Sequence, residues 1–208
     1  MVRQTGLSGE KVGIDVDGVL FDFHRFTCEL LAREGHDVCL TRLHGHDIDF
    51  FPGVGERVIE IVESDDTYLT TEPLDAGFDM LADLLDSGVE CEALTARPRH
   101  MWYLTERRLY EEFKKRGIDH EVPFVKAFGH TKEKAKYVLA NGFTAMVEDN
   151  PRMGKLLLEA GWSADNFFLF EQTWNRDWEE YPNRRKGHEI AKILVQRHKQ
   201  VAWQGATR

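Results

Sequence analysis

The stretch KVGIDVDGVLFDF places two acids one residue apart within a largely apolar run, and this combination constrains the fold more than any other feature of the sequence. Asp15 and Asp17 stand among apolar side chains, namely Val12, Ile14, Val16, Val19 and Leu20. Short runs of this kind, rich in β-branched residues, are typical of a strand in a parallel sheet that is covered on both faces. Because burying an unpaired carboxylate is costly, both acids are expected at the carboxyl end of the strand, close to a compensating charge.

Length and composition fit one ordinary globular domain, or one domain that carries a modest insertion. The chain has 208 residues, of which 42% are hydrophobic and 30% charged, and this is enough to bury a core without disulfides or metal. The formal charge of -9 disfavours a nucleic-acid polymer as partner, because polymer binding needs clustered Lys and Arg. Neither a signal segment nor an apolar stretch of membrane-spanning length is visible, so we expect no membrane partner and a cytoplasmic location.

The cysteines point to the same kind of compartment. Cys28, Cys39 and Cys91 are scattered, odd in number and without CxxC spacing. They indicate neither a disulfide framework nor a thiolate zinc site, which is typical of a protein in a reducing environment.

Strand-like and helix-like segments alternate along most of the chain. Short apolar runs are predicted as strands at 11–17, 89–96, 122–128, 143–150 and 166–172. Amphipathic segments with start and stop signals are predicted as helices at 75–88, 98–117, 131–142 and 151–161. Asp75 and Thr131 are the expected N-caps, and Pro98 the expected first-turn residue. The alternation predicts an α/β fold, with a Rossmann-like three-layer α/β/α core and a parallel sheet.

One segment interrupts this alternation. After the first strand the chain is helix-like, then irregular and rich in His, Asp and Gly, then helix-like again at 55–64. We predict a core formed by residues 10–24 and 73–208, and a small, mainly helical cap at 25–72. Open α/β sheets bind ligands outside the carboxyl ends of their strands, so a cap in this position would cover the ligand site.

Polar side chains follow three predicted strands at the ends that should meet at one edge of the sheet. Asp15 and Asp17 end the first strand, Thr95 the second, and Glu148 and Asp149 the fourth. Several carboxylates in one cleft repel each other unless a cation lies among them, and hard oxygen ligands favour Mg²⁺. The sequence therefore predicts a Mg²⁺ site at this edge.

A lysine is also expected there, since one Mg²⁺ cannot balance these acids and an incoming phosphate dianion as well. The segment GHTKEKAKYV offers Lys132 and Lys134 near the start of a predicted helix. The helix dipole disfavours a cation there by roughly 0.3 to 1 kcal/mol, a cost that a nearby anion would offset.

In their order along the chain, these residues resemble the four sequence motifs of the haloacid dehalogenase superfamily of phosphotransferases. The motifs are DVDGV at 15–19, Thr95 in EALTARP, a lysine on a helix, and the acidic pair in VEDNP, all within about residues 11–172. The resemblance implies a haloacid dehalogenase-like fold with a cap. It also implies a Mg²⁺-dependent phosphomonoester hydrolase that works through an aspartyl-phosphate.

The resemblance assigns a catalytic role to four residues. Asp15 would be the nucleophile, while Asp17 would donate a proton to the leaving oxygen and then activate water. Thr95 would donate a hydrogen bond to the phosphoryl oxygens, and Lys134, which we prefer to Lys132 on its sequence spacing, would pair with Asp15 and the phosphate.

It likewise assigns the metal ligands. Mg²⁺ would be held by Asp15, Asp149 and the main-chain carbonyl of Asp17, and Glu148 would order a water molecule of the metal. Whether Glu148 or Asp149 is the direct ligand stays open in the sequence.

Within the superfamily the chain is most similar to the 5'(3')-deoxyribonucleotidases, on the strength of DGVLFDF, the predicted cap and the late segment FEQTWNRDWEEYPNRRKGHEI. This similarity implies a nucleoside monophosphate as the small phosphorylated substrate. Phe23 would line the base pocket, Arg97 would reach the phosphate or sugar, and Ala96 would offer only its backbone N–H. Further aromatic residues could stack on the base, namely Phe21, Phe26, Phe50 and Phe51.

Other interpretations of function remain open. The substrate could be another small phosphoester or a polynucleotide 3' end, and the chain could also be a catalytically silent binding module of the same fold. The phenylalanines could be core residues between cap and body. A homodimer is compatible with the sequence, which does not give the oligomeric state.

Two further groups of residues have more ordinary explanations. The segment LHGHDIDF could hold a second metal, but clusters of His and acids in irregular loops are usually solvated; the residues concerned are His44, His46, Asp47 and Asp49. Trp174 and Trp178 are predicted to pack the C-terminal segment onto the sheet.

Overall fold

The sheet is the element from which the rest of the fold follows. A computed structural model describes residues 9–37, 54–176 and 183–206. Its strands are β1 (Lys11–Asp15), β2 (Glu90–Thr95), β3 (Phe124–Ala127), β4 (Ala145–Glu148), β5 (Phe167–Phe170) and β6 (Arg184–Arg185). They form one six-stranded sheet in the order β3-β2-β1-β4-β5-β6, and every pair is parallel. The five predicted strands and the parallel sheet are confirmed, whereas the two-residue β6 was not predicted.

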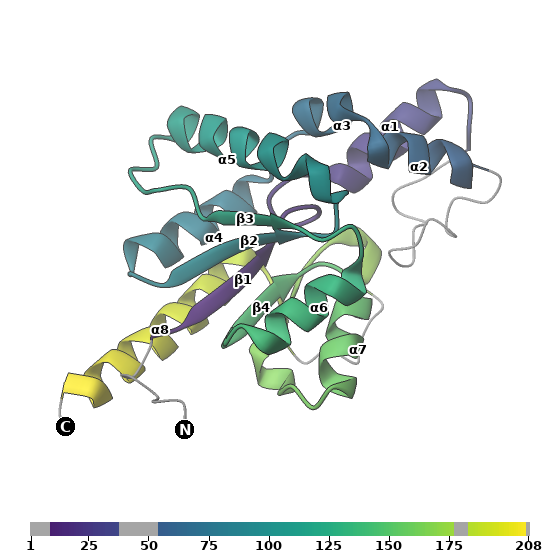
Figure 1. Cartoon of the computed structure of the whole chain (residues 1–208). Coiled ribbons are helices and arrows are strands. Elements are labelled where there is room, and N and C mark those ends of the chain that lie inside the picture. Colours follow the sequence, from purple (N-terminus) through teal and green to yellow (C-terminus); the bar gives the residue numbers. More distant parts are fainter. Residues whose placement is uncertain (1–8, 38–53, 177–182, 207–208) are drawn as a thin grey trace.

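Helices connect the strands and cover both faces of the sheet (Figure 1). The α-helices are α1 (Phe23–Arg33), α2 (Gly55–Glu63), α3 (Asp65–Thr70), α4 (Asp75–Asp86), α5 (Trp102–Arg116), α6 (Thr131–Ala140), α7 (Pro151–Glu159) and α8 (Gly187–Ala206). Short 3₁₀ turns are η3 (Arg99–Met101), η4 (Ala164–Asn166) and η5 (Thr173–Asn175). The four helices predicted after residue 73 are present, while α3 and α8 are additions.

Two apolar clusters show that the fold has three layers. One cluster joins the sheet to α4, α5 and α8 through Phe78, Leu109 and Leu194. The other joins the opposite face of the sheet to α6 and α7 through Val138 and Leu157. All five side chains are buried, so both faces of the sheet are covered, as the continuous apolar runs of its strands require.

Two predicted helix caps are wrong. Asp75 and Thr131 are each the first helical residue, and Leu74 and His130 occupy the N-cap positions. Asp75 is exposed and pairs with Arg116 across 2.6 Å, so its carboxylate is engaged outside its own helix. Neither N-cap residue supplies a side-chain hydrogen bond to its helix.

The start of α5 also differs from the prediction. Pro98 precedes a 3₁₀ turn in which Met101 N donates to Pro98 O over 2.9 Å, and α5 begins at Trp102. Its predicted end is confirmed, because Gly117 closes α5 in the left-handed conformation with a φ of 68°.

The segment predicted as a cap is helical where the structure describes it. Figure 1 shows α1 and α2 on the side of the sheet to which the carboxyl end of β1 points. The two helices are joined by an ion pair of 2.6 Å between Arg57 and Glu34 and by a small apolar cluster that includes Leu31 and Ile61. That residues 25–72 act as a cap stays a prediction.

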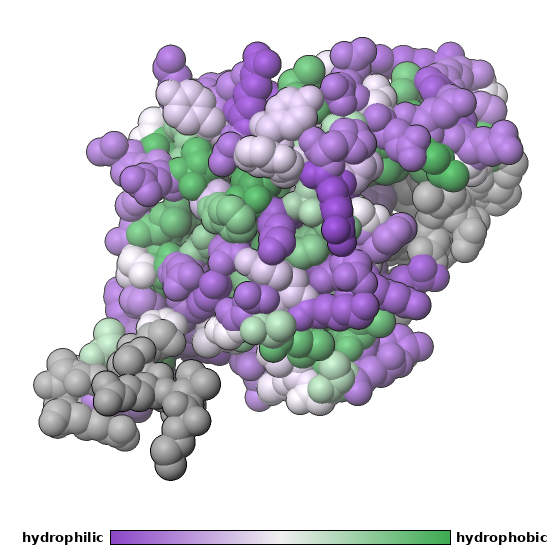
Figure 2. Space-filling view, in the orientation of Figure 1, coloured by the Kyte–Doolittle hydropathy of each residue, from purple (hydrophilic) through white to green (hydrophobic). Residues whose placement is uncertain are grey.

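Length and apolar character decide whether any of the described helices could span a membrane. Among the described helices, none combines the length and the apolar character that crossing a bilayer requires. The face in Figure 2 is mostly hydrophilic, with apolar side chains in scattered places.

Candidate functional site

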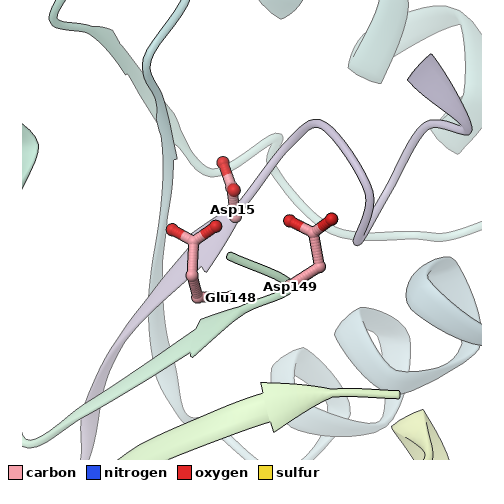
Figure 3. A group of neighbouring side chains, drawn as sticks. All are labelled: Asp15, Glu148 and Asp149. Carbon is pink, nitrogen blue, oxygen red and sulfur yellow. The ribbon is translucent and has the colours of Figure 1, made fainter. Parts of the chain in front are cut away.

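Three carboxylates meet where β1 and β4 end. Asp15 is the last residue of β1, Glu148 the last of β4, and Asp149 follows it. Because β1 and β4 are parallel neighbours, their carboxyl ends lie side by side, and the three side chains point toward a common space (Figure 3). Each offers one oxygen, and these atoms lie within 4.8 Å of one another. The three residues are buried, with exposures of 5%, 0% and 0%.

Lys134 supplies the positive charge that the sequence predicts. It projects from α6, is 1% exposed, and its Nζ lies 3.0 Å from Asp15 Oδ1 and 2.7 Å from Glu148 Oε2. Lys132, the alternative, is exposed on the same helix. Of the two lysines, the structure brings Lys134 to the carboxylates.

The electrostatics of this cluster favour a further cation. Burial, and then the neighbouring Glu148 carboxylate, raise the pKa of Asp15 well above its usual value. Burial also raises the pKa of Glu148, although Lys134 opposes the shift. For Lys134, burial alone would lower the pKa, but the charges of Asp15 and Glu148 outweigh it and hold the pKa above the usual value. When all three carboxylates are ionised they outnumber the one ammonium group, so a bound cation would offset the excess of negative charge.

The donor set fits Mg²⁺. Hard carboxylate oxygens in a compact group are the ligands that this ion prefers, and a divalent charge would offset the excess of acids. Gly18 contributes to the fit, because a Cβ there would lie 2.0 Å from Asp149 Oδ2. Its φ of 81° is in the left-handed region, so glycine lets the loop after β1 bend closely around Asp149.

The variant Gly18→Ala should therefore both destabilise the fold and weaken Mg²⁺ binding. Left-handed backbone at a non-glycine residue costs on the order of 1 to 3 kcal/mol, and the new methyl group would displace the Asp149 carboxylate. Gly35→Ala is the matched control, since Gly35 has a φ of 90° with nothing within 4 Å of the added Cβ. Urea unfolding with and without Mg²⁺ checks the prediction. Equal Mg²⁺ stabilisation of the two variants would contradict it.

A second group of predicted residues lies beside the first. Thr95, at the end of β2, donates from Oγ1 to Asp17 Oδ2 over 3.1 Å. Arg97 binds the same carboxylate in a bidentate manner, with Nη2 at 2.6 Å from Oδ1 and Nε at 2.9 Å from Oδ2. The side chain of Asp17 is 20% exposed. These three residues are thus held together, and Asp17 can be reached from solvent.

Arg97 is anchored more deeply than the sequence suggests. Its Nη1 donates to Thr105 Oγ1 over 2.8 Å, and its guanidinium lies 4.0 Å from the ring centre of Tyr68. The residue is 3% exposed. Its predicted role as a contact of phosphate or sugar stays a prediction, and in this structure its donors face Asp17 and Thr105.

Phe23 and Phe21, both predicted to contact a base, differ from each other in their surroundings. Phe23 is partly buried and stacks on Tyr68, with 6.2 Å between ring centres and 18° between planes. Phe21 is 1% exposed and lies edge-on against Phe78, so for this position the core interpretation holds. Ala96, between Thr95 and Arg97, is partly exposed.

Phe26 is partly buried in the small cluster between α1 and α2. Several other predicted residues lie outside the part of the chain that the structure describes: Cys39, His44, His46, Asp47, Asp49, Phe50, Phe51 and Trp178.

The sequence prediction missed the contribution of the turn η5. Trp174 is buried in the apolar cluster of α1 and α2, and not against the sheet as predicted. Its indole Nε1 donates to Asp149 Oδ2 over 2.8 Å, so it also contacts the acidic cluster. Asn175 Nδ2 donates to the main-chain oxygen of Asp149 over 3.0 Å, and Gln172 Nε2 to that of Gly18 over 2.6 Å. The only signal in the sequence was the resemblance of this late segment to one family.

Comparisons with known proteins match the fold and not the sequence. Protein-family models and curated proteins give no match to the chain. A Thermotoga maritima protein provisionally described as a beta-phosphoglucomutase has a TM-score of 0.53 at 15% identity, over 90% of this chain and 99% of that one.

Two further structures have lower scores. A subfamily IA hydrolase of the haloacid dehalogenase superfamily, from Geobacter sulfurreducens, has a TM-score of 0.49 at 18% identity, over 91% of this chain and 98% of that one. A hydrolase of the same family from Deinococcus radiodurans, solved with phosphate and sodium, has 0.47 at 16%, over 89% and 88%. The α/β fold with a parallel sheet that the sequence predicts is confirmed, and the Thermotoga maritima protein shares it.

Proposed function

We propose that the protein is a Mg²⁺-dependent phosphomonoester hydrolase in which Asp15 is the nucleophile. The observation that carries the proposal is the buried group of Asp15, Glu148, Asp149 and Lys134 at the carboxyl edge of the sheet. Parallel α/β sheets bind their ligands at this edge. Asp17 and Thr95, at the adjacent strand ends, supply a proton carrier and a hydroxyl donor within the same site.

The proposed hydrolysis has two steps, formation of an aspartyl-phosphate and its hydrolysis. Asp15 attacks phosphorus through a carboxylate oxygen while the bond from phosphorus to the leaving oxygen breaks, and Asp17 gives that oxygen a proton. Asp17 then takes a proton from water, whose oxygen attacks phosphorus. The bond from phosphorus to Asp15 breaks, and orthophosphate leaves with the carboxylate of Asp15 restored.

The remaining residues stabilise charge. Lys134, already 3.0 Å from Asp15, is placed to neutralise the phosphoryl oxygens as negative charge gathers on them. Asp15, Asp149 and the main-chain oxygen of Asp17 would hold Mg²⁺, which would supply further neutralisation of negative charge. Glu148 holds Lys134 in place from the other side through its Oε2, 2.7 Å from Nζ.

We propose a nucleoside monophosphate as the substrate. The resemblance of DGVLFDF and the late segment to the deoxyribonucleotidases supports this assignment. The stacked pair of Phe23 and Tyr68 is also compatible with aromatic recognition of a base. Sugar phosphates are the second candidate, because the Thermotoga maritima neighbour is described as a phosphoglucomutase.

A substrate panel tests the proposal. Deoxyribo- and ribonucleoside monophosphates, sugar phosphates and a 3'-phosphorylated oligonucleotide are each incubated with the protein, and orthophosphate release is measured with Mg²⁺ and with EDTA. We expect release from a nucleoside monophosphate, its loss in EDTA and its recovery on adding Mg²⁺. Activity unaffected by EDTA would contradict the metal assignment. No release from any member of the panel would favour a binding module.

A further inference from the structure

We infer that Trp174 is a positioning residue for the metal site: its indole N–H fixes the orientation in which Asp149 presents its carboxylate to a cation. The inference rests on the proposed function, because it takes Asp149 as a metal ligand. It concerns a residue outside the four motifs, in the turn η5 that follows β5.

The contact between Trp174 and Asp149 is a buried hydrogen bond to a carboxylate. Trp174 Nε1 lies 2.8 Å from Asp149 Oδ2, and the two residues are 2% and 0% exposed. A hydrogen bond to an ionised acceptor is about twice as strong as a neutral one, and solvent does not compete with it when it is buried. Rotating the Asp149 carboxylate would break this bond inside the protein.

The position of Trp174 is fixed by bonds on both sides of it. Gln172 Nε2 donates to Gly18 O over 2.6 Å, in the loop after β1. Asn175 Nδ2 donates to Asp149 O over 3.0 Å and to Phe170 O over 2.8 Å. The short segment from Gln172 to Asn175 is therefore bonded to both loops that bring carboxylates to the site.

The plane of the indole is fixed as well. The ring of His24, on α1, stacks on Trp174 with 4.2 Å between ring centres and 22° between planes. His24 belongs to the first turns of the helix that leads into the predicted cap. Trp174 thus lies between the metal-site carboxylate and the base of α1, and tilting the indole out of its plane would break this stack.

Hydrogen bonds to a metal-binding side chain commonly change metal affinity by about 10- to 100-fold when removed. Because Trp174 acts on Asp149 and not on the substrate, its loss should weaken Mg²⁺ binding and leave the KM for substrate at saturating Mg²⁺ unchanged. A residue with a packing role alone would lower the stability of the metal-free protein and leave its affinity for Mg²⁺ unaltered.

The test compares Trp174→Phe, which keeps an aromatic ring but lacks the N–H, with Trp102→Phe, which alters a tryptophan that is 49% exposed. Mg²⁺ is titrated against the thermal unfolding temperature of the full chain. We expect the Mg²⁺ dissociation constant of Trp174→Phe to rise about 10- to 100-fold, and that of Trp102→Phe to equal the wild-type value. Higher Mg²⁺ should then restore kcat in Trp174→Phe.

If Trp174→Phe does not fold, β-(3-benzothienyl)alanine at position 174 keeps the bicyclic shape and removes only the N–H donor. Equal Mg²⁺ affinity in the wild type and in a folded position-174 variant would overturn the inference while leaving the proposed function in place. Absence of Mg²⁺ binding by the wild type would instead contradict the proposed function.

Discussion

Replacing Asp15 by asparagine should abolish phosphomonoester hydrolysis, with a loss on the order of 10⁴-fold or more. The amide is not a nucleophile, so no aspartyl-phosphate can form. The fold should tolerate the change, because the Asp15 carboxylate is buried and its pKa is raised well above the usual value. A charge held under such conditions opposes folding, and the neutral amide of similar shape removes it.

The measurement is orthophosphate release together with urea unfolding of the metal-free protein. We expect activity to vanish and the free energy of unfolding to be equal to or above that of the wild type. Asp17→Asn is the companion variant, since it should retain phosphate binding and slow turnover by about 10² to 10⁴-fold. Undiminished turnover in Asp15→Asn would remove Asp15 from the mechanism.

Replacing Lys134 by methionine should have the largest effect on stability. The ammonium group lies 3.0 Å from Asp15 and 2.7 Å from Glu148, and all three residues are buried. Removing one partner of a buried ionic group leaves uncompensated charge and typically costs about 3 to 5 kcal/mol. Lys132→Met, an exposed change on the same helix, is the control and should stay within about 0.5 kcal/mol of the wild type.

The loss in Lys134→Met should depend on pH. In the metal-free protein the pKa values of Asp15 and Glu148 are raised, so the folded state binds more protons than the unfolded state as pH rises above the usual carboxyl pKa. The stability that these acids contribute is present at low pH and lost as pH rises through their folded pKa values. Without Lys134 this loss should be larger.

Urea unfolding of wild type and Lys134→Met in EDTA at pH 5 and pH 8 checks this expectation. The gap between the two proteins should be smaller at pH 5 than at pH 8. A gap that is the same at both pH values would show that Lys134 does not compensate the acids.

Strands and helices with a clear pattern of apolar residues could be predicted from the sequence, and elements without one could not. β1, β2 and β4 are short apolar runs with polar residues at their carboxyl ends, and these are the strands that build the site. α8 was not predicted because it begins at Gly187, a residue that normally ends helices. A Cβ at Gly187 would lie 2.4 Å from Ala76 O, so the glycine is required by the packing of α8 against α4 and carries no local helix signal.

Some residues of the candidate site could also be predicted from the sequence, and others could not. Asp15, Thr95 and Glu148 could be placed together because parallel strands end at one edge. The spacing of the motif favoured Lys134 over Lys132, but both stand in the same part of α6, and only the structure gives the direction of each side chain. The bond from Trp174 to Asp149 spans 25 residues and has no periodic signature, so the sequence could not reveal it.

The central position of β1 has a consequence for the order of events during synthesis. Val12 pairs with Cys91 on one side and with Ala145 on the other, so β1 is synthesised before both of its neighbours in the sheet and has to wait for them. At roughly 5 to 20 residues per second, the nascent chain spends several seconds with this apolar strand and its acids unprotected. Chaperone occupancy should therefore be greatest on ribosome-bound fragments that stop before β4, and fall once β4 has emerged.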